Sequence, residues 1–238
     1  MKFNLSWIRE FVEAADPPAE LARRLTSAGL PVETIAEGPE GDTILDIEIF
    51  SNRPDCMNVY GVAREIAAST GRGLCPYPSE VAEAATGPAA VDQASVQIED
   101  ADLCGRYSAR VMLDVRIGPS PEWLARRLIS VGLRPVNNVV DVTNYVLLEY
   151  GHPLHAFDVG ALTGRQIRVR RARKGESITT LDGVARPLGA EMLVIADAER
   201  PVAIAGVMGG AATMVSERTT GLLLESAWFD PVSVRRTA

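Results

Sequence analysis

The chain has 238 residues, of which 47% are hydrophobic and 23% charged, and these proportions are typical of a folded globular protein rather than a disordered one. The sequence contains no run of about 18 apolar residues, the length that a membrane-spanning helix needs. The start of the chain is unlike a secretory leader. The three cysteines, Cys56, Cys75 and Cys104, lack CxxC spacing and indicate neither a zinc ribbon nor a disulfide framework, so we expect a cytoplasmic protein.

The net charge of −7 is unevenly distributed along the chain. Residues 1–94 carry 7 basic and 15 acidic side chains, whereas residues 95–238 carry 17 basic and 16 acidic ones. One basic stretch, from Arg165 to Lys174, holds five arginines and a lysine. On an exposed strand this stretch could follow the phosphates of a nucleic acid. A solvated strand edge that charge protects from aggregation is an equally good interpretation.

The first 75 residues predict a small, mainly helical domain with one or two strands. Asp16, followed by two prolines, is a typical helix start, and Gly29 is a typical helix end. In residues 43–50 the more polar and the apolar side chains alternate, which is typical of a strand. A second helix is predicted to start at Asn52–Asp55 and to end at Gly71.

Residues 76–94 are rich in proline, glycine and alanine, which is typical of a linker. Residues 95–238 are predicted to form a second, mixed α+β domain. It has two expected helices, Ser120–Gly132 and Val140–Glu149. The expected strands are 95–99, 106–113, 166–171, 192–196, 202–205 and 222–224.

Several common catalytic motifs are absent. The sequence contains no GxxxxGK[ST] phosphate loop, no GxGxxG, no HExxH and no GxSxG. The two histidines, His152 and His155, are three residues apart with Asp158 nearby, but Pro153 prevents their presentation on one helix. We therefore expect no metal site.

The second domain contains a series of distinctive motifs. They begin with VVDVTNYVLLE at 139–149 and GHPLHAFD at 151–158. The later motifs are TLDG at 180–183, LVIAD at 193–197, AGVMGG at 205–210 and LLESAWFDP at 223–231. In this order and spacing, over about 140 residues, they resemble the editing domain of bacterial phenylalanyl-tRNA synthetase beta subunits. The first 75 residues also resemble the family's N-terminal domain, notably NRPDC at 52–56.

The chain departs from the family pattern in two places. The family usually has an oligonucleotide-binding barrel inserted in its N-terminal domain, but residues 36–41 are far too short for one. The chain also ends at Ala238, directly after the editing domain, so we expect a fragment. The resemblance implies tRNA(Phe) and a synthetase alpha subunit as partners, in a heterotetramer when full length, with neither DNA nor a membrane. It implies ATP and Mg²⁺ for the complete synthetase only, and no cofactor for editing.

An editing site must distinguish tyrosine from phenylalanine by one hydroxyl. A hydrophobic pocket discriminates against a substrate with an added hydroxyl by a factor on the order of 100. A second site that hydrolyses the wrong product is therefore useful. A buried acceptor in that site would favour tyrosine. Glu225 lies in an apolar run, and the resemblance assigns it this role. A buried salt bridge, for example to Arg218, is the alternative.

The resemblance assigns the remaining site residues as well. Ala205 and Gly206 would line the tyrosyl pocket, although on their own they indicate only a tight turn. Thr143, Asn144 and His155 would form a polar wall that positions the ester and the attacking water. A histidine bonded within a loop is the plainer interpretation of His155.

Two hypotheses follow. The chain is either a module that hydrolyses mischarged Tyr-tRNA(Phe), or a non-catalytic tRNA-binding or assembly module of the synthetase. Neither includes ligation by this chain alone.

Overall fold

The computed structural model describes residues 1–76, 80–81 and 86–238. The predicted linker, 76–94, therefore lies partly outside the described residues. Within its described part, a short helix, α4 (Ala90–Gln93), precedes the second domain's first strand. No helix that the structure describes is long and apolar enough to cross a membrane.

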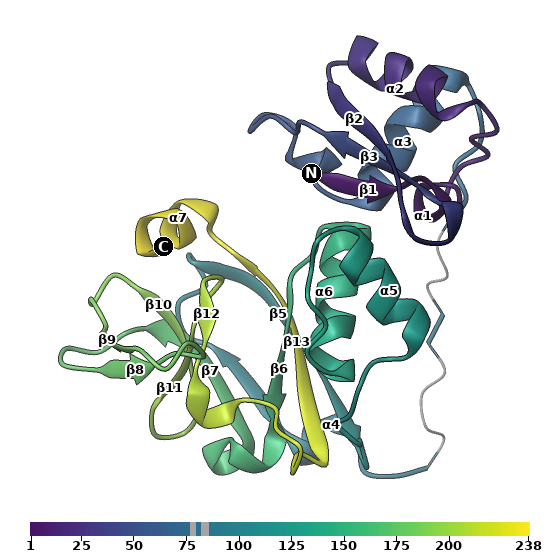
Figure 1. Ribbon diagram of the computed structural model, residues 1–238. Helices are drawn as coiled ribbons and strands as arrows, with labels where there is room; N and C mark the ends of the chain where they lie inside the picture. The colour runs from purple at the N-terminus through teal and green to yellow at the C-terminus, as the bar shows by residue number, and fades with distance from the viewer. Residues whose placement is uncertain (77–79, 82–85) are drawn as a thin grey trace. The chain divides into compact units, whose positions relative to one another are not determined.

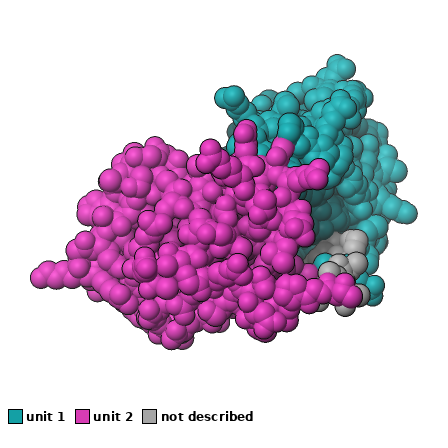
Figure 2. All heavy atoms as spheres, turned by 90° about the horizontal axis from the view of Figure 1, so that it is seen from below, with its two compact units in different colours: residues 1–83, 119–153 teal, residues 84–118, 154–238 magenta. Residues whose placement is uncertain are grey.

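The chain forms two compact units, whose helices and strands are labelled in Figure 1 and which are coloured separately in Figure 2. Each unit has its own hydrophobic core. Unit 1 contains residues 1–83 and 119–153, and unit 2 contains residues 84–118 and 154–238. The predicted α+β class is confirmed, because both units combine helices with antiparallel strands.

Unit 1 contains a three-stranded antiparallel sheet in the order β1-β3-β2. Its strands are β1 (Lys2–Asn4), β2 (Val32–Glu37) and β3 (Thr43–Ile47). A tight turn joins β2 to β3, in which the Gly38 amide donates to the Asp42 carbonyl at 2.7 Å. This turn occupies the place where the family pattern has its barrel.

In the part of unit 1 that the structure describes, five α-helices accompany the sheet. They are α1 (Leu5–Ile8), α2 (Pro18–Ser27), α3 (Val59–Thr70), α5 (Glu122–Ser130) and α6 (Asn138–Tyr150). Helix α3 begins where the Asn58 side chain accepts the Gly61 amide at 2.7 Å, and it ends at Gly71, whose φ is +70°. The apolar face of α3 packs on the side chains of Phe3, Trp7 and Leu45 in the unit 1 core.

Helices α2 and α5 share the sequence LARRL and end in the same way. In α2 the Leu30 amide donates to the Leu25 carbonyl at 2.9 Å, and in α5 the Leu133 amide donates to the Leu128 carbonyl at 2.8 Å. Gly29 and Gly132 supply the left-handed residue that this helix end requires. The repeated sequence therefore reflects a shared way of ending a helix.

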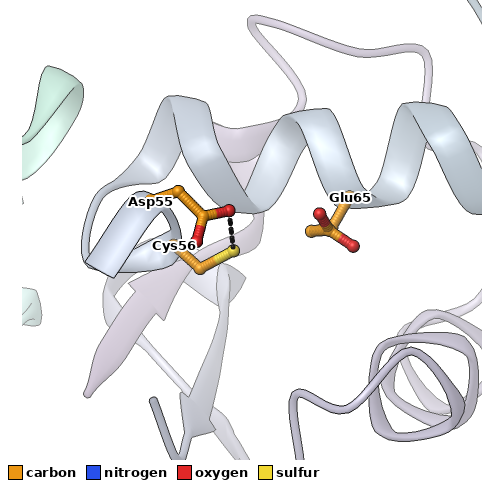
Figure 3. Close-up of side chains that lie close together, drawn as sticks. All are labelled: Asp55, Cys56 and Glu65. Atoms are coloured by element: carbon orange, nitrogen blue, oxygen red, sulfur yellow. Dashed lines mark hydrogen bonds between the residues drawn. The ribbon is translucent and has the colours of Figure 1, made fainter. Parts of the chain in front are cut away.

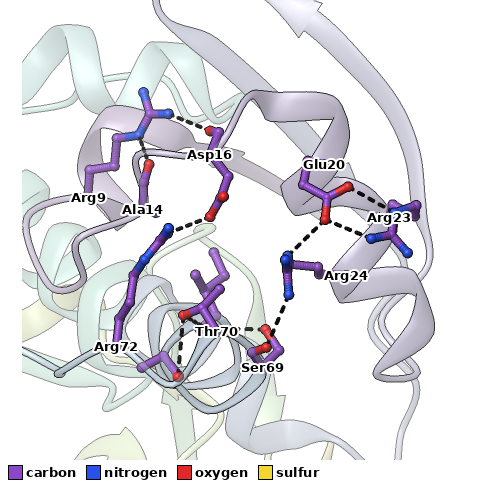
Figure 4. Close-up of polar contacts among 11 residues, drawn as sticks. Arg9, Ala14, Asp16, Glu20, Arg23, Arg24, Ser69, Thr70 and Arg72 are labelled. Carbon is purple, nitrogen blue, oxygen red and sulfur yellow. Dashed lines mark hydrogen bonds and ion pairs between the residues drawn. The ribbon is translucent and has the colours of Figure 1, made fainter.

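Polar contacts tie α2 and α3 together in unit 1 (Figure 4). The Arg24 side chain bonds to the Ser69 carbonyl at 3.3 Å and to Glu20 at 3.0 Å. Arg72, just after α3, pairs with Asp16, just before α2. These contacts lie at the surface, so we expect each to stabilise the unit by well under 1 kcal/mol.

The compact units differ from the predicted domain boundary at residues 94/95, because α5 and α6 pack with the N-terminal core. The Trp7 ring stacks on Tyr145 of α6 with centroids 4.8 Å apart. Its indole N–H donates to the buried Glu149 carboxylate at 3.1 Å. The guanidinium of Arg127 on α5 lies 5.2 Å from the Trp7 ring centroid. Residues 119–153 therefore group with unit 1.

Unit 2 contains a five-stranded sheet, a three-stranded sheet and a two-stranded ribbon. The five-stranded sheet has the order β12-β11-β10-β7-β4, with β12 (Met208–Gly209), β11 (Pro201–Ile204), β10 (Leu193–Ala196), β7 (Gln166–Arg171) and β4 (Ser95–Ile98). The three-stranded sheet has the order β5-β13-β6, with β5 (Cys104–Leu113), β13 (Gly221–Phe229) and β6 (Leu154–Asp158). The ribbon pairs β8 (Ser177–Thr179) with β9 (Ala185–Pro187), and α7 (Pro231–Thr237) follows β13.

Candidate functional site

The register of the three-stranded sheet brings two predicted site residues together. Glu225 in the middle strand β13 lies directly opposite His155 on β6 and Ala109 on β5. Directly opposed residues of an antiparallel pair project from the same face of a sheet. That face packs into the unit 2 core, where Leu223 and Phe157 are fully buried two residues away.

Glu225 is a buried carboxylate, with 6% of its surface exposed. The Tyr107 hydroxyl donates to its Oε2 at 2.8 Å. Burial raises the pKa of Glu225 to about 7, and the Tyr107 hydrogen bond acts in the opposite direction. Arg218 is exposed and forms no ion pair with Glu225, and the structure describes both residues. The salt-bridge alternative is therefore wrong for this pair.

His155 has an imidazole held in apolar surroundings. Its ring lies edge-on to Phe157 with centroids 4.5 Å apart. Among the described residues, nothing is hydrogen bonded to its buried Nε2. Burial lowers the pKa of His155 to about 4, so the ring is neutral at neutral pH. A neutral ring with an unused nitrogen can accept a proton from water or donate one.

Gly209 explains part of the glycine-rich motif that follows β11. A Cβ at this position would lie 2.4 Å from Cε1 and 2.8 Å from Nε2 of His155. The imidazole edge therefore rests against the backbone of Gly209, and a side chain here would displace it.

Ala205 and Gly206 form the turn after β11. Ala205 is buried, its amide donates to the Leu193 carbonyl at 3.0 Å, and it belongs to the core cluster on which Tyr107 packs. Gly206 has a φ of +69°, and a Cβ there would lie 2.8 Å from Val234. Both a left-handed conformation and close packing therefore require glycine at 206.

Thr143 and Asn144 lie on α6 in unit 1, whereas the other predicted site residues lie in unit 2. Both are half-buried, and the Thr143 hydroxyl donates to the Val140 carbonyl at 2.7 Å. Consecutive residues on a helix project about 100° apart. Their contribution to a site with His155 stays a prediction.

The comparisons with known proteins identify the family. A family model described as "B3/4 domain" matches residues 103–238, which is more than half of the chain. The chain belongs to the B3/4 domain family. The curated relatives are phenylalanine–tRNA ligase beta subunits, which confirms the resemblance seen in the sequence.

The relative from Carboxydothermus hydrogenoformans is 49% identical over 226 residues, which cover 95% of this chain and 28% of the relative. The relative from Moorella thermoacetica is 55% identical over 200 residues, which cover 83% of this chain and 24% of the relative. The chain thus spans about a quarter of the length of these relatives. A solved N-terminal fragment of the Pyrococcus horikoshii phenylalanyl-tRNA synthetase beta subunit matches with a TM-score of 0.49 and 15% identity, covering 98% of this chain and 69% of that one.

Three of the six basic side chains in the stretch from Arg165 to Lys174 form ion pairs with carboxylates. Arg168 pairs with Glu99 at 2.5 Å and Arg170 with Glu176 at 2.7 Å. Arg171 pairs with both Asp100 and Asp102. The stretch falls mainly in β7, which lies between β10 and β4 and contains no exposed residue, so the predicted exposed strand edge is wrong. The ion pairs of Arg168, Arg170 and Arg171 also argue against a continuous phosphate-binding track.

Outside the B3/4 domain, Asp55, Cys56 and Glu65 gather ligand-type atoms within 4.8 Å of one another (Figure 3). The Arg53 guanidinium already bonds to these groups, at 2.9 Å to Asp55 and Cys56 and 2.7 Å to Glu65. Burial raises the pKa of the Cys56 thiol to about 12. This cluster is an arginine-centred contact, because Arg53 bonds to all three side chains.

Tyr107 is the residue of this site that sequence reasoning did not single out. The alternation in β5 contains the available signal, because Tyr107, Ala109 and Val111 share the apolar face while Arg106, Ser108 and Arg110 occupy the other. A tyrosine on a buried face needs a partner for its hydroxyl. The sequence does not identify that partner, because it lies 118 residues away.

Proposed function

We propose that this chain carries a hydrolytic site for tyrosyl esters of tRNA(Phe). The observation that supports the proposal is a buried carboxylate that already accepts a phenolic hydroxyl, from Tyr107 to Glu225 at 2.8 Å. The side chain of a tyrosyl ester offers the same donor, whereas phenylalanine offers none. Leaving a buried acceptor unpaired costs about 1–3 kcal/mol, or roughly 5- to 150-fold in preference.

In this proposal Ala205 and Gly206 line the space for the ring. His155 acts on the attacking water through Nε2, which is free of protein partners among the described residues. Because an aminoacyl ester is already activated, a positioned water and donors to the developing oxyanion supply enough catalysis without a metal.

We further propose that the chain functions in the cytoplasm as part of a phenylalanine–tRNA ligase beta subunit, with the alpha subunit and tRNA(Phe) as partners. Ligation with ATP and Mg²⁺ belongs to the complete synthetase. The support is the high identity to beta subunits along 95% of the chain.

The test is deacylation of Tyr-tRNA(Phe) and Phe-tRNA(Phe) by the purified chain. We expect faster hydrolysis of the tyrosyl ester and loss of that preference in Glu225→Ala, which has no side-chain acceptor. Glu217→Ala, at an exposed position of the same unit, is the matched control and should leave the preference unchanged. Equal rates at the level of buffer alone for both esters would contradict the proposal.

The second candidate is a non-catalytic binding or assembly module. The net charge of −8 in residues 1–94 favours an assembly role for the N-terminal part, because this region would repel tRNA. Filter retention of tRNA at increasing salt distinguishes the two candidates. Salt-dependent binding without deacylation would support the second.

A further inference from the structure

Tyr107 has a place in the candidate site that its strand position alone does not explain. Tyr107 on β5 lies opposite Ala227 of β13, and Ala227 is two residues from Glu225 on the same, core-facing side of the sheet. Tyr107 is thus a diagonal neighbour of Glu225, at a separation that a long side chain can bridge. Its hydroxyl reaches Oε2 of Glu225 and leaves Oε1 outside this bond.

A carboxylate has two oxygens and about four lone-pair sites, so one phenol does not saturate it. The small residues beside Glu225, Ala109 and Ala227, do not compete for the second oxygen. An oriented carboxylate that already holds one phenol can therefore accept a second without first losing a partner.

We propose that Tyr107 is a positioning residue of the tyrosine-selective site, whose phenol fixes the Glu225 carboxylate so that Oε1 accepts the hydroxyl of a tyrosyl ester. This inference rests on the proposed function. It adds a residue that acts through Glu225.

The surroundings of Glu225 make the proposal measurable by pH. The titratable groups that face it are Tyr107 and Cys104 from β5 and His155 from β6, while β10 and β11 contribute apolar side chains. Burial raises the pKa of Tyr107 well above its usual value, raises the pKa of Cys104, and lowers the pKa of His155 to about 4. Glu225 is therefore the group of this face whose charge changes near neutral pH.

Removal of the Tyr107 hydroxyl takes away a donor that stabilises the charged carboxylate. In Tyr107→Phe we expect the pKa of Glu225 to rise by about one unit, because a hydrogen bond of ordinary strength corresponds to about that shift. At pH 7 the charged fraction of the carboxyl then falls from about one half to about one tenth. The preference for the tyrosyl ester should therefore fall at least about fivefold at pH 7, and the part of the loss that comes from protonation should recover as the pH rises towards 9.

The experiment compares Tyr- and Phe-tRNA(Phe) hydrolysis from pH 6 to 9 by the wild type, Tyr107→Phe and the control Tyr60→Phe. In parallel, carbon-13 NMR of the Glu225 carboxyl in the tRNA-free protein measures its titration directly. Incorporation of 3-fluorotyrosine at position 107 retains the ring and strengthens the donor, so it should move the Glu225 titration downwards. If Tyr107→Phe does not fold, the protein with 3-fluorotyrosine still tests whether residue 107 sets the titration of Glu225.

The two failures are distinguishable. Absence of hydrolysis by the wild type overturns the proposed function. A wild type that edits, with a Tyr107→Phe variant that keeps its preference and pH profile, overturns the role of Tyr107. An unchanged Glu225 titration in both Tyr107-altered proteins overturns it as well, whatever the activity.

Discussion

Glu225 and His155 face each other across two strands, and their titrations should have opposite effects on stability. Burial raises the pKa of Glu225 from 4.5 to about 7 and lowers the pKa of His155 from 6.5 to about 4. We consider two substitutions that remove one titration each, Glu225→Gln and His155→Gln.

The sign of each effect follows from where the proton binds. Below pH 4.5 Glu225 is protonated in the folded and unfolded states, and its contribution to stability is lost as the pH rises through 7. His155 behaves in the opposite way, because above pH 6.5 it is neutral in both states, and stability is lost as the pH falls through 4. Each shift of about 2.5 units corresponds to on the order of 3 kcal/mol.

In the wild type the two contributions largely offset each other between pH 4.5 and 6.5. In Glu225→Gln the Glu225 titration is removed, so the free energy of unfolding of the variant minus that of the wild type should rise by about 3 kcal/mol from pH 4.5 to 7. In His155→Gln the His155 titration is removed, and the same difference should fall by about 3 kcal/mol from pH 4 to 6.5.

Urea unfolding followed by circular dichroism, at steps of half a pH unit, measures these differences. Titrations elsewhere in the chain are shared and cancel when a variant is subtracted from the wild type. The exposed substitution Glu217→Gln controls for replacing a glutamate. Parallel profiles for the wild type and both variants would refute the reasoning, because they would mean that neither side chain has a shifted pKa.

Substitutions at three further positions test the packing around the core and the site. Gly209→Ala should cost about 1–3 kcal/mol in urea unfolding, because its Cβ would lie 2.4 Å from the His155 ring; an unchanged midpoint contradicts that contact. Glu149→Ala leaves the buried Trp7 indole N–H without its acceptor and should cost about 1–3 kcal/mol, seen also as a shift in tryptophan emission; unaltered emission would count against the bond. Asn58→Ala removes the cap of α3 and should cost about 1 kcal/mol, whereas Asn58→Asp should retain most of the stability.

The helices were predictable because their ends have local signals. Predicted ends at Gly29, Gly71 and Gly132 are confirmed by left-handed glycines at all three positions. The strands were less predictable, because their evidence is pairing with distant residues. The predicted strand at 222–224 extends to Phe229, since Glu225 and Ser226 interrupt the apolar run although the backbone pairing continues.

The candidate site was predictable by residue type but not by arrangement. Strand β6 was not predicted, because LHAFD follows Pro153 and is too short for a clear alternation. Without β6 the register that places His155 opposite Glu225 cannot be deduced. Tyr107 was missed for the same reason, since its bond to Glu225 depends on the pairing of β5 with β13.

The next pair of opposed residues on the core-facing side of β13 and β6 serves only to pack the core. Leu223 and Phe157 are directly opposed, both fully buried and both apolar. Two residues further along β13, on the same face of the sheet, the opposed pair is Glu225 and His155. Each of these side chains is costly to bury in its charged form. A sheet selected for stability alone would continue the apolar pattern, because replacing buried ionisable groups with apolar ones is often neutral or stabilising. The retention of two oppositely shifted groups on one rung is therefore better explained by chemistry at this place than by the needs of the fold.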